Sequence, residues 1–464
     1  MDPRAALSEA KPKPFWLDQA TTPDRRPPQC GGSTVDLVIV GAGFTGLWAA
    51  IQAVEDNPNL SVIVIDSGRI GAQASGRNGG FCSSSLTHGL ENGHSRFPQE
   101  MSRLDALAEQ NFAGIRDAIQ RYDIECGWEE TGSLSVATQP WCVDGLLESA
   151  ELEREYGHSV EVLSAEDTRA LVNSPTYLGA LRTTDGEALV DPARLAWGLA
   201  SAAEALGVVL HEDTPMLSLE QTRAGMAVRT ASGTIQCAKV ILATNAFKSP
   251  VKAINRMIAP VYDYVLMTQP LTDQQMDEIG WKGREGLSDR TNLFHYYRLT
   301  EDNRILWGGY DAVYHYGSKI DPSLDISDET HATLATHFYD TFPQLEDVGF
   351  SHRWGGVIDT CSRFSVSFGT AFDRRAAYAV GYTGLGVGAT RFGARVCLDL
   401  LGHPDSDLLN LQLVRKKPIP FPPEPIRWMG IELTRRAVAK SDANGGRRGP
   451  WLSLLDAVGL GFDS

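Results

Sequence analysis

The chain of 464 residues lacks the residue spacings that mark several common classes of functional site. Its seven cysteines include no CxxC pair, and the sequence contains no HExxH, no GxSxG turn and no phosphate-binding P-loop. These absences exclude the usual zinc, nucleophile-elbow and P-loop classes, and we predict no metal site. An odd number of cysteines is also typical of a reducing cytoplasm, where we expect this protein to act.

Positive charge is scarce: 42 Lys and Arg residues stand against 58 Asp and Glu residues, which gives a formal net charge of -16. This balance argues against nucleic acid or an anionic membrane surface as the main partner. A long unbroken apolar run is absent too, since the most apolar long window, residues 37–54, contains three glycines. We therefore expect no membrane span, and the first 16 residues predict no secretory signal.

The most informative stretch that is present runs from residue 35 to residue 50, VDLVIVGAGFTGLWAA. A short apolar run leads into Gly41, Gly43 and Gly46, and a helix-like segment follows at once. In such a turn the three glycines permit the tight bend, the approach of a pyrophosphate and the packing of helix against strand. Asp66 ends a second apolar run at the distance where an acid accepts the hydroxyls of a ribose. The sequence therefore predicts a dinucleotide-binding βαβ unit.

Two further Gly-rich turns follow strand-like segments, at residues 75–80 and 381–388. The first lies in a polar stretch too long for an ordinary connection in a compact protein, and such loops are usually functional. The second predicts a strand, a turn and a helix whose N-terminus can hold an anion. The segment KVILATNAF predicts one more strand that approaches the same site.

These motifs carry a family resemblance. In PFWLDQA, VIVGAGFTGLWAA, GAQASGRNGGF, LVDPARLAWGLA, ATNAF, RILWGG and YAVGYTGLGVGATRFGA, the chain resembles the FAD-dependent amine and amino-acid oxidoreductases that include D-amino-acid oxidase, sarcosine oxidase and glycine oxidase. It is most similar to the gamma-glutamylputrescine oxidase-like branch. The resemblance implies an α/β protein (α+β overall), with a Rossmann-like FAD-binding domain of discontinuous segments and a β-rich substrate domain.

The division of the chain follows from the resemblance and from composition. The expected units are an N-terminal arm (1–33), an FAD-binding domain (34–92, 163–252 and 353–415), a substrate domain (93–162 and 253–352) and a C-terminal tail (416–464). The arm is Pro-rich and polar, and we expect Phe15 and Trp16 to dock it on the body of the protein.

The cofactor implied by the resemblance is FAD. The residues expected to bind it are Gly41, Gly43, Gly46, Asp66, Ser75, Arg77, Asn78, Gly79, Gly80, Thr244, Asn245, Gly381, Gly384, Leu385, Gly386 and Val387. Ser75 is expected to donate to a phosphate oxygen, and Arg77 and Asn78 to lie near the flavin ring. The N–H groups of residues 385–387 would stabilise reduced flavin. For Arg77 the alternative is an incidental ion pair at the surface. For the glycines of residues 381–388 the alternative is that they only permit tight packing of the helix.

Aromatic residues are dense between residues 294 and 316, which predicts pocket walls. Because side chains alternate along a strand, about half of these aromatic residues point to the opposite face of the sheet. Each of them can therefore either pack in the core or contact a ligand. The candidate catalytic residues are Tyr297, Arg298, His295 and Trp307. Arg298 would pair with a substrate anion or a structural carboxylate, and His295 would accept a proton or be structural.

Two departures from the sarcosine oxidase branch bear on the chemistry. The position of its flavin-linking cysteine falls at Gly355 or Gly356 here, with Cys361 beyond, so we expect non-covalent FAD. The position of its oxygen-reactive lysine holds Leu306 or Trp307.

We predict oxidation of a primary or secondary amine, such as a polyamine derivative or an N-substituted amino acid, at the C–N bond. Hydride transfer to flavin N5 would give an imine that water hydrolyses, and O2 would reoxidise the flavin with release of H2O2. A quinone or carrier protein as electron acceptor, and a purely structural FAD, stay open as alternatives. An NAD-binding protein is a weaker alternative, because a nicotinamide enzyme does not need the second and third Gly-rich turns.

Overall fold

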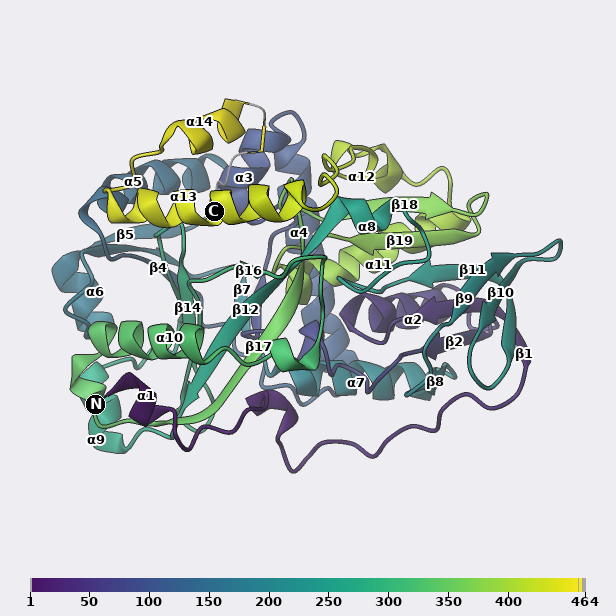
Figure 1. Ribbon diagram of the computed structural model, residues 1–464, viewed down its shortest axis with the longest axis horizontal. Helices are drawn as coiled ribbons and strands as arrows, with labels where there is room; N and C mark the ends of the chain where they lie inside the picture. Colours follow the sequence, from purple (N-terminus) through teal and green to yellow (C-terminus); the bar gives the residue numbers. More distant parts are fainter. Residues whose placement is uncertain (1, 458, 461–464) are drawn as a thin grey trace.

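Two large β-sheets lie next to each other in the computed structural model, which describes residues 2–457 and 459–460 (Figure 1). The sheet on the right of the view carries the dinucleotide-binding unit, and the sheet on the left is covered below by helix α10 (Asp328–Thr341). The functional cavity lies where the two sheets meet, as described below. The confirmed fold class is therefore α/β, with a Rossmann-like half and a β-rich half.

The first sheet has eight strands, in the order β18-β19-β11-β1-β2-β8, with β10 and β9 continuing from β11. The joins from β19 to β8 are parallel, as in a doubly wound sheet. Its strands are β1 (Ser33–Val40), β2 (Val62–Ile65), β8 (Val209–His211), β9 (Ser218–Gln221), β10 (Met226–Arg229), β11 (Thr234–Leu242), β18 (Ser367–Ala371) and β19 (Ala376–Val380). Residues 37–40 and all of β2 are buried because apolar clusters cover both faces.

The second sheet has nine strands, in the order β16-β12-β15-β14-β13-β4-β6-β5, with β17 paired to β12. Its strands are β4 (Ser133–Ala137), β5 (Val160–Ser164), β6 (Gly179–Thr183), β12 (Ile258–Thr268), β13 (Gly286–Asp289), β14 (His295–Leu299), β15 (Ile305–Gly309), β16 (Val313–Tyr314) and β17 (Phe350–Cys361). A small separate sheet pairs β3 (Phe81–Ser83) with β7 (Glu187–Leu189).

The helices carry the covering layers. Besides α10, they are α1 (Pro3–Ala6), α2 (Phe44–Asp56), α3 (Gly89–Arg96), α4 (Met101–Arg121), α5 (Pro140–Glu155), α6 (Ala165–Leu171), α7 (Pro192–Ala205), α8 (Ile254–Met257), α9 (Asp273–Ile279), α11 (Gly386–Gly402), α12 (Gln412–Arg415), α13 (Ile426–Ala443) and α14 (Pro450–Ala457). Within the described part of the chain, none of these helices combines the length and apolar character that a membrane crossing requires.

The sheets divide the chain at somewhat different points from those expected. Strands β6 and β17 lie in ranges that we assigned to the FAD-binding domain, yet both pair within the nine-stranded sheet. The cause is local pairing: β6 is joined to β4 and β5, and β17 runs antiparallel to β12 over its whole length. The second half therefore contains more of the chain than the residues alone indicated.

The N-terminal arm runs along the lower edge of the molecule from α1 to β1 (Figure 1). Trp16 is buried, and its Nε1 donates to the backbone oxygen of Asn78 at 2.9 Å. Phe15 packs edge-on against His352, with ring centroids 5.3 Å apart. The arm thus contacts both halves and ties one of the Gly-rich turns in place.

Candidate functional site

A cavity of about 980 Å³ extends from the carboxyl ends of β1, β2 and β11 to the nine-stranded sheet. Ligand sites of parallel sheets lie at this edge, and small-molecule pockets range from roughly 300 to 1,000 Å³. The volume is large enough for a dinucleotide and a small second molecule. The cavity brings together residues from all three Gly-rich turns.

The first turn is built as its spacing predicts. A Cβ on Gly41 would lie 2.3 Å from the Ala243 oxygen, and one on Gly46 would lie 1.9 Å from the Gly41 oxygen. These two glycines therefore permit the strand-to-helix packing, and Gly46 does not line the cavity. Gly43 does line it, as the N-cap of α2 without any side-chain cap. The free N–H groups and positive dipole end of α2 thus face the cavity.

Ser75 touches this helix N-terminus directly. Its Oγ accepts a hydrogen bond from the Phe44 backbone N–H at 3.0 Å. The hydroxyl therefore caps α2, a role that sequence reasoning missed, and its own proton remains free to be donated to an anion.

Asp66 follows β2 and lines the cavity. Its Oδ2 accepts from the Ala42 N–H at 2.7 Å and its Oδ1 from the Gly68 N–H at 2.9 Å. Burial raises the pKa of this carboxyl above its ordinary value, although the two N–H groups oppose the shift. Each oxygen keeps a further lone pair for a ligand hydroxyl.

Two side chains of the turn at residues 75–80 bond to the protein itself, Arg77 across to the second sheet and Asn78 within and next to the turn. Arg77 pairs with Asp325 at 2.5 Å and donates to the Gly355 oxygen at 3.1 Å. The Asn78 side chain donates to two backbone oxygens of the same turn and accepts from the Gly80 N–H. Arg77, Asn78 and Gly79 line the cavity, whereas Gly80 does not. The two side chains therefore fix the shape of the wall.

Two polar atoms just after β11 have no hydrogen-bond partner among the described residues. They are the Thr244 Oγ1 and the Asn245 Oδ1, both buried and both on residues that line the cavity. Asn245 also has φ of +49°, in the left-handed region. Buried polar atoms are almost always hydrogen-bonded, so these two atoms indicate that a polar ligand completes the site. Their position beside the first turn fits FAD.

The third turn brings a second helix N-terminus to the cavity. Gly384, Leu385, Gly386 and Val387 line it, and α11 starts at Gly386 without a side-chain cap. The Leu385 N–H, which we expected to be free for flavin, donates instead to the Tyr382 oxygen at 3.2 Å.

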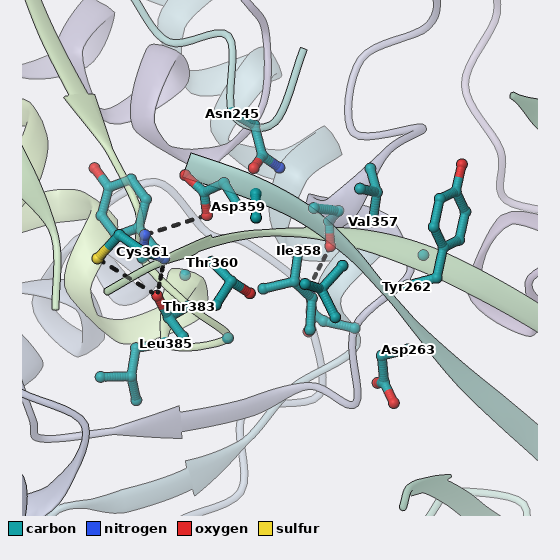
Figure 2. A pocket seen from close by; sticks show the side chains of 18 of the residues that line it. Asn245, Tyr262, Asp263, Val357, Ile358, Asp359, Thr360, Cys361, Thr383 and Leu385 are labelled. Atoms are coloured by element: carbon teal, nitrogen blue, oxygen red, sulfur yellow. Dashed lines mark hydrogen bonds between the residues drawn. The ribbon is translucent and has the colours of Figure 1, made fainter. Parts of the chain in front are cut away.

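Gly381 does not line the cavity, because it packs on Cys361: a Cβ there would lie 2.9 Å from the Cys361 Sγ. A buried acid supports this turn, which the sequence alone did not reveal. The Asp359 carboxylate accepts from the backbone N–H groups of Gly381 at 2.6 Å and Tyr382 at 3.1 Å. Burial raises its pKa to about 7. Figure 2 shows Asp359, Cys361 and Thr383 gathered at one side of the pocket and Asp263 at the other.

The substrate end of the cavity is walled by the nine-stranded sheet. Tyr296 of β14, Asp263 of β12 and Tyr310 line it. The Tyr296 hydroxyl donates to the Asp263 carboxylate, and a Cβ on Gly79 would lie 2.7 Å from the Tyr296 ring. This acid–phenol pair therefore borders both the second Gly-rich turn and the substrate end.

Three of the candidate catalytic residues point away from the cavity. Tyr297, His295 and Trp307 lie on the opposite face of the sheet, toward α10, and none of them lines the cavity among the described residues. Tyr297 exchanges a hydrogen bond with the Tyr177 hydroxyl at 2.8 Å, and the Tyr297 and Trp307 rings are 4.5 Å apart. His295 is held between Asp289 (2.6 Å) and His337 (3.0 Å).

The fourth candidate, Arg298, is buried on the cofactor side of the sheet without reaching the cavity surface. Its Nη1 donates to the Val190 oxygen at 2.7 Å, and its guanidinium lies 5.7 Å from the Trp16 ring centroid. Burial lowers its pKa to about 10. Arg298 pairs with neither of the partners we considered: it joins the arm to the backbone beside the second Gly-rich turn.

The segment after residue 415 forms the remaining wall. Helix α13 crosses the top of the nine-stranded sheet in Figure 1, with α14 above it. The tail residues that line the cavity are Phe421, Pro422, Ile426, Arg427, Gly430, Ile431, Thr434, Arg435, Val438, Trp451, Leu455 and Leu460. The apolar character of PWLSLLDAVGL was the only sequence signal for this contribution, and it did not indicate where the segment docks.

Comparisons with known proteins agree with this geometry. Residues 36–400 match the family described as DAO, FAD dependent oxidoreductase. The chain is 33% identical over 376 residues to gamma-glutamylputrescine oxidoreductase of Escherichia coli, covering 79% of this chain and 84% of that protein. It is 28% identical to the probable oxidoreductase OrdL of Haemophilus influenzae, covering 85% and 89%.

Among solved structures, glycine oxidase of Geobacillus kaustophilus aligns with a TM-score of 0.68 at 20% identity, over 82% of this chain and 99% of that one. The fold, the family and the FAD cofactor expected from the residues are thereby confirmed. The chain belongs to the FAD dependent oxidoreductase family, DAO.

Proposed function

We propose that the protein oxidises a primary or secondary amine, such as a polyamine derivative or an N-substituted amino acid, at its C–N bond. FAD, when bound, accepts the hydride from the carbon next to nitrogen. Water would hydrolyse the imine to a carbonyl compound and ammonia from a primary amine, or a smaller amine from a secondary one, and O2 would take up the two electrons with two protons to give H2O2. One observation carries the proposal: a single cavity extends from the cofactor-binding turns to an end walled by the second sheet, where the Asp263–Tyr296 pair lies.

The residues that would hold FAD are those at the cofactor end of this cavity. The proposed set comprises Gly43, Asp66, Ser75, Gly79, Thr244, Asn245, Gly384, Gly386 and Val387. Gly41 lines this end too, whereas Gly46, Gly80 and Gly381 would act indirectly, because they let the three turns pack closely. Arg77 and Asn78 would shape the wall beside the ring, and Leu385 would begin the helix that faces it.

The protein's part in the chemistry is positioning. Hydride leaves only from a neutral amine, so the chamber must bind the amine, exclude water and remove one proton. The walls from β12, β14 and the tail supply a largely apolar enclosure, and placing two reactants in such an enclosure is a large part of catalysis. The names of two similar proteins, gamma-glutamylputrescine oxidoreductase and glycine oxidase, support an amine or amino acid as substrate.

A dehydrogenase that passes electrons to a quinone or carrier protein is the second candidate. It is favoured by Leu306 and Trp307, which are both buried away from the cavity surface. Neither side chain offers a cation where the sarcosine oxidase branch has its lysine.

Non-covalent attachment of FAD is part of the proposal. Gly356 lines the cavity at the expected linking position and has no nucleophile, while the Cys361 Sγ is turned to the Ser365 oxygen at 3.2 Å. Acid precipitation of the purified protein should release all the flavin into the supernatant. Flavin that stays in the pellet of the wild type but not of Cys361→Ser would contradict this part.

An anaerobic titration tests the function. The visible flavin band should be bleached by an amine from a panel of primary amines, secondary amines and amino acids, and air should restore it with peroxide. Restoration only by a quinone or dye would select the dehydrogenase, and a fully FAD-loaded protein that no amine reduces, although dithionite does, would contradict amine oxidation.

We also propose a cytoplasmic location, supported by the cysteines. All seven are free, and Cys30 is exposed. Free thiols persist where the environment is reducing.

A further inference from the structure

We propose that Asp263, held by Tyr296, binds the ammonium group of the substrate and selects amines that carry no carboxylate on the reacting carbon. The inference rests on the proposed amine oxidation and deepens it by naming the recognition group. It assigns Asp263 as a catalytic residue and Tyr296 as the residue that positions it.

The position of Asp263 is the first support. It lies on β12 directly opposite Gly356 of β17, and a Cβ on Gly356 would lie 3.5 Å from the Arg77 Cβ. Its partner Tyr296 lies against Gly79. The carboxylate therefore lies beside the turn that borders the flavin site, on the side of the substrate chamber (Figure 2).

The second support is that no cation of the protein neutralises this carboxylate. Among the described residues, no Lys or Arg forms an ion pair with Asp263; its side-chain partner is the Tyr296 hydroxyl. Of the cations that line the cavity, Arg77 pairs with Asp325 and Arg435 pairs with Asp311, whereas Arg427 donates to the Ser318 hydroxyl and the Pro422 oxygen. A buried charge needs a partner, and a substrate ammonium would supply it.

The lack of a cation paired with Asp263 would also explain why amines are preferred to amino acids. An amino acid brings a carboxylate next to its ammonium group, and such a pair would place a second negative charge close to Asp263. Like charges in a site of low polarity repel strongly, and no Lys or Arg in the described part of the chain pairs with Asp263 to compensate. A simple amine brings only the positive charge.

The surroundings of Asp263 give its carboxylate a pKa suited to binding an ammonium group and accepting a proton from it near neutral pH. Burial raises its pKa to about 6, against the opposing effect of the Tyr296 hydrogen bond. Tyr296 lies on the same face and bonds Asp263, and the charge of His295 acts on it from the opposite face of the sheet. The charged groups Arg77, Asp311 and Arg435 line the same cavity. Above pH 6 the carboxylate accepts N–H bonds from the ammonium group. As one N–H bond breaks, its proton forms an O–H bond on Asp263, and the neutral amine that remains can lose hydride.

Calorimetry with an unreactive cation tests this without turnover. tert-Butylammonium has no hydrogen on the carbon next to nitrogen, so it cannot be oxidised, and tert-butanol is its neutral counterpart. The FAD-loaded wild type should bind the cation at pH 8 up to about tenfold more tightly than at pH 5, because Asp263 is mostly neutral at the lower pH. The alcohol should show no such dependence.

Two variants distinguish the effect of the Asp263 charge from an effect on the packing of the cavity wall. Asp263→Asn keeps the shape and an acceptor for Tyr296, and it should lose the pH dependence and weaken cation binding about tenfold or more. Tyr296→Phe should keep most of the cation affinity while shifting its pH midpoint upward, since the bond that stabilises the carboxylate is gone. Asp347→Asn, at an exposed site, is the matched control and should behave as the wild type.

The outcomes distinguish a failure of the Asp263 assignment from a failure of the proposed amine oxidation. Equal cation affinity of Asp263→Asn and wild type, with flavin content and melting temperature unchanged, would overturn the assignment of Asp263 even if amines are oxidised. Faster anaerobic reduction by α-amino acids than by the matching amines would overturn the selectivity. If the wild type binds the cation through Asp263 but no amine ever reduces the flavin, the proposed function fails while the binding site stands.

Discussion

Arg435 of α13 and Asp311, which follows β15, form an ion pair across the substrate chamber, with 2.9 Å between Nη1 and Oδ1. Both residues line the cavity. The pair joins the tail to the sheet at the wall of the cavity. Further contacts along the same helix, from Arg427 to the Ser318 hydroxyl and from Asp442 to the Leu293 N–H, fix its position.

Removing this pair should loosen the chamber. Arg435→Met keeps the stem and loses the charge, and we expect KM for the best amine to rise about three- to tenfold with little change in the flavin spectrum. The pair is partly exposed, so its energetic contribution is modest. Steady-state kinetics measures the effect, and Arg436→Met, an exposed neighbour, is the control. An unchanged KM in Arg435→Met would show that α13 is held by its other contacts.

Gly43→Val should abolish FAD binding. A Cβ at this position would lie 2.8 Å from the Ser75 Oγ, and the larger side chain would stand in front of the N-terminus of α2. The ratio of flavin to protein absorbance after purification reports the loss. Gly449→Ala, where a Cβ meets nothing within 4 Å, should keep the full ratio. A yellow Gly43→Val protein would refute the assignment of the first turn.

Thr244→Val should separate cofactor binding from folding. In the absence of ligand the Thr244 Oγ1 is a buried polar atom without a partner, a situation that costs about 1–3 kcal/mol. Replacing it by a methyl group of the same shape should therefore leave the apoprotein as stable or more stable. The rise in melting temperature on adding FAD should become smaller. An apoprotein that is strongly destabilised would show that the hydroxyl serves the fold.

Tyr297→Phe and Tyr296→Phe form a neighbouring pair with opposite expected effects. Tyr297 bonds Tyr177 in the core, so its variant should lose about 1–2 kcal/mol of unfolding free energy and keep the kinetic constants. Tyr296 faces the cavity and the Asp263 carboxylate, so its variant should alter the pH dependence of amine oxidation. If Tyr297→Phe changed the kinetics and Tyr296→Phe changed only the stability, the substrate would lie on the α10 side of the sheet.

Asp359 should make stability depend on pH. Its pKa is about 7 in the folded protein, well above the ordinary value of 3.8. A raised pKa means that the folded state binds the proton more tightly, so this stabilisation is complete below about pH 3.8 and is lost as the pH rises through 7. Each pKa unit corresponds to about 1.4 kcal/mol.

The check is a comparison of apoprotein melting between pH 5 and pH 8. The wild type should lose more stability over this range than Asp359→Asn does. Parallel melting curves would indicate that the Gly381 and Tyr382 N–H groups keep the carboxylate ionised at both pH values.

The cofactor half of the protein was predictable from its residues because glycine spacing reports backbone geometry directly. Gly41, Gly46 and Gly80 all lie where a side chain would meet backbone atoms, and Asp66 directly follows β2, at the end of the apolar run. What remained hidden were contacts between distant segments. Neither the Asp359 support of the third turn nor the Ser75 cap on α2 follows any local pattern.

The substrate half was not predictable to the same degree because alternation in a strand leaves two choices of face. The aromatic run showed that β14 borders a pocket, but no local signal distinguished Tyr296 from Tyr297. The buried arm and α10 decide between them, since one covers each face of the sheet. Residues 416–460 likewise carry no motif that states where they dock.

The wall formed by α13 and α14 also has a consequence for biosynthesis. Translation proceeds from the N-terminus, so all three Gly-rich turns leave the ribosome before the two helices that close the chamber do. During that interval all the residues of the cofactor site have been synthesised, but the site is still open to solvent. Flavin can therefore enter a nascent chain by a route wider than any that the finished protein offers.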